Sequence, residues 1–109
     1  MVGLDTGFFI AYMNREPEAL SYWEALSASD VPPIVSILTI GELLYISYRL
    51  SKPDAGKKIV DSIYAATRVL PIDREIVEKA AALKASRGMP YVDSLIFATF
   101  LIAGCKEIH

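Results

Sequence analysis

Hydrophobic residues along this chain follow two patterns, short uninterrupted runs and longer stretches with helical spacing. The short runs predict buried strands over residues 2–4, 33–37 and 68–71, and the opening of a fourth strand over residues 106–108. The longer stretches predict helices over residues 6–14, 16–29, 38–50, 51–67, 73–88 and 91–105. Short strands that alternate with helices favour one α/β domain over residues 1–109, with a short parallel β-sheet sandwiched by helices.

Several of the predicted helix ends carry specific signals. Asp73 is placed to cap the helix that stops at Gly88. Ser51 and Asp54, three residues apart, have the spacing of a capping box for the helix that runs to about residue 67. The stretch 91–105 is apolar almost all round, so we expect that helix to be buried.

Composition narrows the class of protein. The chain has 109 residues, which is enough for one domain. Hydrophobic residues make up 53% of it, above the roughly 45–50% of an average soluble domain, and this excess leads us to expect a homodimer. The single cysteine, Cys105, excludes a disulfide framework and fits a reducing, cytoplasmic location, with its thiol packed as a small hydrophobic group.

No segment predicts export or insertion into a membrane. Residues 1–14 contain Asp5 but no Lys or Arg, so they lack the basic region of a signal peptide. The longest uncharged apolar stretch, 94–105, is shorter than the ~20 residues that span a bilayer. The net charge of −2 gives no general attraction to nucleic acid, so any such binding must depend on a local site.

Three acidic residues stand out because of their neighbours. Asp5 directly follows the first predicted strand, and parallel sheets bind ligands beyond the carboxyl ends of their strands. Glu42 lies on the apolar stripe of one predicted helix and Asp93 on that of another. An unpaired carboxylate in such a position costs free energy. Three carboxylates brought together repel one another, and a hard divalent ion such as Mg²⁺ or Mn²⁺ removes that repulsion. A shared metal site that acts on a phosphodiester is therefore one interpretation.

Each acid also has a simpler interpretation as part of a helix cap. Asp5 can cap a helix that starts at Thr6, and Asp93 can cap one that starts at Val92 or Ser94. Glu42 closes the pattern Thr39-Ile-Gly-Glu42, which has the form of a capping box. The residues by themselves leave both interpretations open.

Three segments in order resemble the motifs of the PIN-domain family over essentially the whole chain. They are Leu4-Asp5-Thr6-Gly7-Phe8-Phe9, Ile40-Gly41-Glu42-Leu43-Leu44-Tyr45 and Tyr91-Val92-Asp93-Ser94-Leu95-Ile96-Phe97-Ala98-Thr99. PIN domains are metal-dependent ribonucleases with a three-layer α/β/α fold, and many small prokaryotic ones are VapC-type toxins of toxin–antitoxin pairs.

The resemblance implies roles for individual residues. Asp5, Glu42 and Asp93 would be the catalytic acids and the ligands of Mg²⁺ or Mn²⁺, and Thr6 would be a supporting hydroxyl. The implied reaction is in-line attack on an RNA phosphodiester by a water that the metal ion activates. An antitoxin protein is the implied partner, beside the RNA substrate and a second copy of the chain.

The sequence departs from the family at its C-terminal end. The family usually carries a fourth acid just after the strand that follows the last of these helices. Here that strand begins at Lys106 and the sequence ends at His109, so the fourth acid is absent and the final strand is truncated. Glu107 falls inside the predicted strand and is a poor substitute. A fragment and a naturally short protein both fit this pattern, and the exposed sheet edge would favour pairing.

Two other functions compete with a nuclease. One is a non-catalytic PIN-like module that binds a protein partner, which the missing fourth acid supports. The other is a phosphoryl-transfer domain with Asp5 as nucleophile, which Gly7 disfavours because the corresponding phosphatases have Asp-x-Asp at this strand end. His109 is expected to be disordered. Candidates for contact with RNA phosphates are Arg49, Lys52, Lys57 and Lys58, for which ordinary solvent-exposed helix faces are the simpler interpretation. Candidates for base stacking are Tyr12, Trp23, Tyr45 and Tyr48, for which packing in the core or against a second copy is the simpler interpretation.

Overall fold

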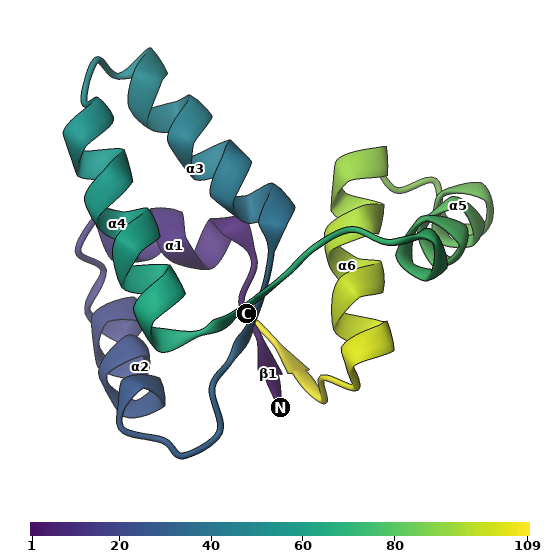
Figure 1. Cartoon of the computed structure of the whole chain (residues 1–109), viewed down its shortest axis with the longest axis horizontal. Helices are drawn as coiled ribbons and strands as arrows, with labels where there is room; N and C mark the ends of the chain where they lie inside the picture. The colour runs from purple at the N-terminus through teal and green to yellow at the C-terminus, as the bar shows by residue number, and fades with distance from the viewer.

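The computed structural model describes residues 1–109 and contains a four-stranded parallel sheet with helices on both faces (Figure 1). The strands are β1 (Val2–Gly3), β2 (Ile34–Ser36), β3 (Arg68–Leu70) and β4 (Glu107–Ile108). The helices are α1 (Thr6–Met13), α2 (Pro17–Ser27), α3 (Ile37–Arg49), α4 (Pro53–Ala66), α5 (Arg74–Arg87) and α6 (Tyr91–Ala103). The predicted α/β class and the predicted order of strands and helices are confirmed.

The strands lie in the order β3-β2-β1-β4, and all neighbouring strands are parallel. β4 pairs with β1, and the pairing continues past it, because the His109 N–H donates to the Gly3 carbonyl at 2.8 Å and the Asp5 N–H donates to the His109 carbonyl at 2.7 Å. The His109 ring also lies 4.4 Å from the ring of Tyr22, centroid to centroid. The expectation that His109 is disordered is therefore wrong, since sheet pairing orders this residue.

The two faces of the sheet carry separate hydrophobic clusters because side chains alternate along a strand. Helices α1 to α4 cover one face and α5 and α6 cover the other (Figure 1). On the first face Val35 packs in a cluster that includes Phe9, Leu43 and Ile63. On the second face its neighbour Ile34 packs against Ile96 and Phe100 of α6. Cys105 packs against this second cluster, and its burial raises the pKa of the thiol, as suits a packing residue.

The helix ends confirm one predicted signal and correct another. The Asp73 carboxylate accepts from the Ile76 N–H at 2.9 Å, and Gly88 ends α5 in the left-handed conformation with φ of 66°. The predicted capping box at Ser51 is wrong. Ser51 has φ of 56°, Lys52 occupies the cap position without a side-chain hydrogen bond, and Pro53 starts α4, because its fixed φ suits the first helical position.

Helix α6 is buried on one side only, so the prediction that it is buried all round is wrong. Ile96 and Phe100 are buried, whereas Val92, Leu101 and Ile102 are 36–42% exposed. The reason is that α6 lies in an outer layer, in contact with α5 on one flank and with β2 and α3 on another. No helix of the chain is both long enough and apolar enough to cross a lipid bilayer.

Candidate active site

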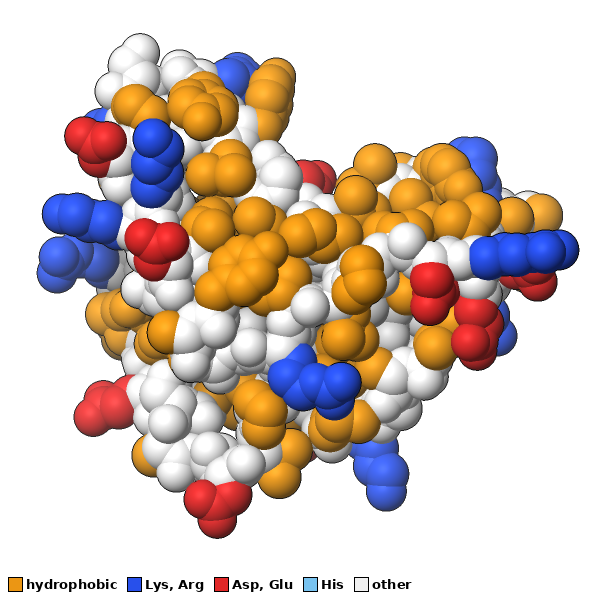
Figure 2. All heavy atoms as spheres, in the orientation of Figure 1, with side chains coloured by type: hydrophobic (Ala, Val, Ile, Leu, Met, Phe, Trp, Pro, Cys, Tyr) orange, Lys and Arg blue, Asp and Glu red, His pale blue; other side chains and the backbone are white.

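A cavity of about 390 Å³ lies where the carboxyl end of β1 meets α1, α3 and α6. Asp5, Glu42 and Asp93 all line it, so the fold brings the three predicted acids to one place. Figure 2 shows the corresponding notch between the lobe that contains α3 and the lobe that contains α6, with hydrophobic side chains on both walls. The other lining residues are Thr6, Gly7, Ile10, Ile46, Met89, Ile96, Phe97, Phe100 and Ile108.

The two carboxylate oxygens of Asp5 have different environments. Its Oδ1 accepts from the Phe8 N–H at 2.9 Å, so the cap interpretation of this residue is confirmed. This hydrogen bond occupies one carboxylate oxygen and leaves Oδ2 without a protein partner. The helix cap therefore fixes the side chain at the end of β1 and keeps one oxygen available to a ligand in the cavity.

Glu42 accepts a hydrogen bond from one hydroxyl group, that of Thr6, and belongs to no capping box. The helix cap of α3 is Ser36, whose hydroxyl accepts from the Leu38 N–H at 3.1 Å, so α3 begins two residues before Thr39. The Thr6 hydroxyl instead donates to Glu42 Oε1 at 2.5 Å and lies 3.0 Å from the Thr39 hydroxyl. Thr39 therefore supports the site through Thr6, although its spacing from Glu42 predicts a helix cap. Its position three residues before Glu42, on the same helical face, was the available signal.

Asp93 lies in the first turn of α6 and makes no side-chain hydrogen bond within the protein. α6 begins at Tyr91 with Pro90 in the cap position, so the interpretation of Asp93 as a helix cap is wrong. The side chain is exposed at the mouth of the cavity. A carboxylate in a first helical turn interacts favourably with the helix dipole, which lowers the cost of this position without neutralising its charge.

The cavity has negative charge and no protein counter-charge. No Lys, Arg or His lines it, and the ion pairs in the structure, Arg74–Glu78 and Glu107–His109, lie elsewhere. The free carboxylate oxygens are the donors that Mg²⁺ and Mn²⁺ prefer, so the chemistry of the lining fits such an ion. The three carboxylates are spaced more widely than the ligands of one metal ion, since no group of three His, Cys, Asp or Glu side chains is close enough to hold an ion together.

Comparison with known proteins identifies the family. Residues 2–109 match the PIN domain family. This chain belongs to that family. No curated protein sequence matches it.

Solved structures of similar fold share low sequence identity with this PIN domain. A toxin–antitoxin complex from Klebsiella pneumoniae superimposes with a TM-score of 0.78 at 19% identity, over 100% of this chain and 85% of that one. VapC20 of Mycobacterium tuberculosis, described as a Sarcin-Ricin loop cleaving toxin, gives 0.78 at 20% identity, over 99% and 87%. VapBC2 of Rickettsia felis, bound to a DNA fragment from its promoter, gives 0.81 at 16% identity, over 100% and 86%. At these identities the likeness establishes the fold.

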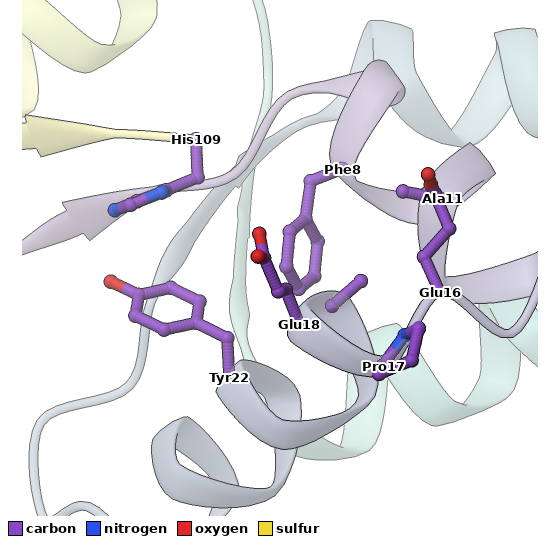
Figure 3. Close-up of a pocket in the computed structure, with 8 residues that line it drawn as sticks. Phe8, Ala11, Glu16, Pro17, Glu18, Tyr22 and His109 are labelled. Carbon is purple, nitrogen blue, oxygen red and sulfur yellow. The ribbon is translucent and has the colours of Figure 1, made fainter.

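A second, larger cavity of about 680 Å³ lies on this PIN domain away from the three acids (Figure 3). It is formed by α1, the start of α2 and the end of β4, with Glu18, Tyr22 and His109 among its lining residues. Glu107 lies on this side of β4, where it accepts from the Tyr22 hydroxyl at 3.2 Å and contacts His109 Nε2 at 3.3 Å. The next residue, Ile108, lines the acidic cavity, so Glu107 does not contribute to that cavity.

The contact between Tyr22 and Glu107 predicts a titration result. Burial raises the pKa of Tyr22 above 10.0, and the hydrogen bond to Glu107 and the negative charge of that residue raise it further. The protonated phenol is the donor, so this contribution to folding is complete below pH 10 and is lost as the pH rises through the raised pKa. Glu107→Gln should lower the pKa of Tyr22 toward 10.0 without reaching it, as measured by NMR titration of the tyrosine rings.

Glu18→Gln is the matched control for this titration. Glu18 lines the same cavity but makes no hydrogen bond to Tyr22, so the pKa of Tyr22 should stay where it is in the unmodified protein. An unchanged pKa of Tyr22 in Glu107→Gln would contradict the contact.

Proposed function

We propose that this PIN domain is a metal-dependent endoribonuclease that acts as the toxin of a toxin–antitoxin pair. The observation that carries the proposal is the convergence of Asp5, Glu42 and Asp93 on one cavity that has no basic residue. Membership of the PIN domain family over residues 2–109 supports the same conclusion. The VapC-type proteins of similar fold support the toxin assignment.

Each acid has a distinct part in the proposed site. Asp5 contributes Oδ2 while its Oδ1 stays on the helix cap, and Glu42 contributes Oε2 while its Oε1 accepts from Thr6. Asp93 contributes a carboxylate without other contacts from the opposite wall on α6. A bound Mg²⁺ or Mn²⁺ would supply Lewis-acid chemistry for hydrolysis of a phosphodiester. The hydrogen bonds from the Phe8 N–H and the Thr6 hydroxyl hold the carboxylates of Asp5 and Glu42 in place.

The proposed partners are RNA, an antitoxin and a second copy of the chain. Toxin–antitoxin complexes recur among the structures of similar fold, which supports the antitoxin. Large side chains of α3 and α4 and the turn between them are 52–61% exposed, and this apolar surface supports the dimer. These side chains are Tyr45, Tyr48, Leu50 and Tyr64.

The test is Mn²⁺ binding and RNA cleavage measured in the same samples. Mn²⁺ is titrated into the 109-residue protein by calorimetry, and a mixed-sequence RNA is then added with Mn²⁺. The expected result is binding and cleavage by the unmodified protein and loss of both in Asp5→Asn/Asp93→Asn. The double variant should keep the fold, because Asn serves as well as Asp at the helix cap of Asp5 and the exposed Asp93 side chain makes no hydrogen bond within the protein.

A non-catalytic module that binds a protein partner is the second candidate. The observation that favours it is the looser spacing of the acids, since no three of them are grouped closely enough for one ion. Folded protein that neither binds Mn²⁺ nor cleaves RNA would support this candidate and refute the nuclease. If the protein bound Mn²⁺ but did not cleave RNA, the metal site would be supported and the ribonuclease activity would be refuted.

A further inference from the structure

The hydrogen bonds around Glu42 have a direction that donor counting decides. Thr6 Oγ1 lies 2.5 Å from Glu42 Oε1 and 3.0 Å from Thr39 Oγ1. An ionised carboxylate only accepts, and a hydroxyl carries one hydrogen, so the Thr6 hydrogen goes to Glu42. The hydrogen between the two threonines must then come from Thr39. The contacts form a directed chain in which Thr39 donates to Thr6 and Thr6 donates to Glu42.

Thr39 depends on this contact for its own hydrogen bonding. Its side chain is completely buried, and its hydroxyl makes no hydrogen bond other than the one to Thr6. Buried threonines elsewhere in a helix commonly bond a carbonyl of the preceding turn, as Thr99 does with the Leu95 carbonyl at 2.9 Å. Rotation of Thr6 away from Glu42 would leave a buried hydroxyl without a partner, which the protein interior penalises.

We propose that Thr39 is a positioning residue of the acidic site. Its buried hydroxyl holds Thr6, and through Thr6 it holds the carboxylate of Glu42 in the orientation that lines the cavity. This inference rests on the proposed function, because the orientation of the Glu42 carboxylate matters through the affinity of the site for a divalent cation. Thr39 is not a lining residue of the cavity, so its effect on a ligand passes through Thr6 and Glu42.

The test compares variants that differ by one hydroxyl. Thr39→Val removes the donor and preserves the shape, and Thr39→Ser retains the donor. Mn²⁺ affinity measured by calorimetry should fall about 10-fold or more in Thr39→Val, as for other groups that orient a metal ligand, and Thr39→Ser should restore it. Thr99→Val is the matched control, since it removes an equally buried threonine hydroxyl that bonds the Leu95 carbonyl and has no contact with the acids, and it should leave Mn²⁺ affinity unchanged.

A second variant keeps the test decisive if Thr39→Val does not fold. Thr6→Val interrupts the same chain from a less buried position and should weaken Mn²⁺ binding as well. In the double variant the two losses should not add, because both substitutions break one chain. Fully additive losses, or a folded Thr39→Val protein with unchanged Mn²⁺ affinity, would overturn the inference.

Failure of the proposed function gives a different result. Unmodified protein that binds no Mn²⁺ refutes the metal site itself. Crystal structures of the unmodified protein and of Thr39→Val then decide the positioning role without any metal. A displaced Glu42 carboxylate in the variant supports the role, and an unchanged contact between Thr6 and Glu42 overturns it.

Discussion

Asp5→Asn should fold as stably as the unmodified protein and lose Mn²⁺ binding by more than about 100-fold, which is the upper range for groups that only orient a ligand. The asparagine oxygen still accepts from the Phe8 N–H, so helix α1 keeps its cap. The neutral amide removes one of the three charges that we assign to the cation. Asp5→Ala should lose both functions, at about 0.5–2 kcal/mol of folding stability for the missing cap. Urea denaturation and calorimetry with Mn²⁺ measure the two effects separately.

Asp73 provides a matched control for the cap of Asp5. Its carboxylate caps α5 with the same 2.9 Å contact to the N–H three residues on, and it does not line the acidic cavity. Asp73→Ala should therefore reduce stability as Asp5→Ala does, with no effect on Mn²⁺ affinity. Asp5→Asn protein that still bound Mn²⁺ like the unmodified protein would restrict Asp5 to its role in the helix cap.

Gly3→Ala should destabilise the protein by about 1–3 kcal/mol, the usual cost of overpacking a core. A Cβ atom at this position of β1 would lie 2.5 Å from Cδ1 and 2.7 Å from Cγ of Phe100. The Phe100 ring is 1% exposed, and it cannot move without disturbing the cluster on that face of the sheet. With total stabilities of about 5–15 kcal/mol for small domains, this loss should be evident in thermal and urea denaturation.

Two further variants identify the clash as the cause. Gly41→Ala introduces the same methyl group in α3, where a Cβ meets nothing within 4 Å, and it should stabilise the protein by roughly 0.5–1 kcal/mol because alanine is the better helix former. Phe100→Leu should recover part of the loss in the Gly3→Ala background, since the two sites are in direct contact. Equal stability of Gly3→Ala and Gly41→Ala would contradict the close packing at β1.

The order and kind of the helices and strands follow from local sequence. The strand β2 is a short apolar run, and helix α5 carries its own end signals, Asp73 and Gly88. The role of Asp5 as a helix cap is also predictable from the sequence, because it needs only a hydrogen bond from the Phe8 N–H, three residues away. The family resemblance of the three motifs was likewise present in the sequence, and the match over residues 2–109 confirms it.

Local signals failed where distant groups compete. The capping boxes at Ser51 and Thr39 have the correct spacing, but helix α4 starts at Pro53 and helix α3 starts at Ile37. The Thr39 hydroxyl instead meets Thr6, 33 residues earlier in the chain. His109 is ordered by backbone hydrogen bonds with Gly3 and Asp5. The sequence of the last residues does not predict these bonds.

Only the tertiary structure decides that the three acids share a cavity. Asp5 caps α1, Glu42 lies on α3 and Asp93 lies in the first turn of α6. They line one cavity because β1 lies between β2 and β4 in the sheet. The physical reason is that a hydrophobic run determines whether a segment is buried, whereas strand order depends on which buried faces pack together. The sequence alone therefore determined the elements and the identity of the candidate acids, and the packing of the helices around β1 determined their common environment.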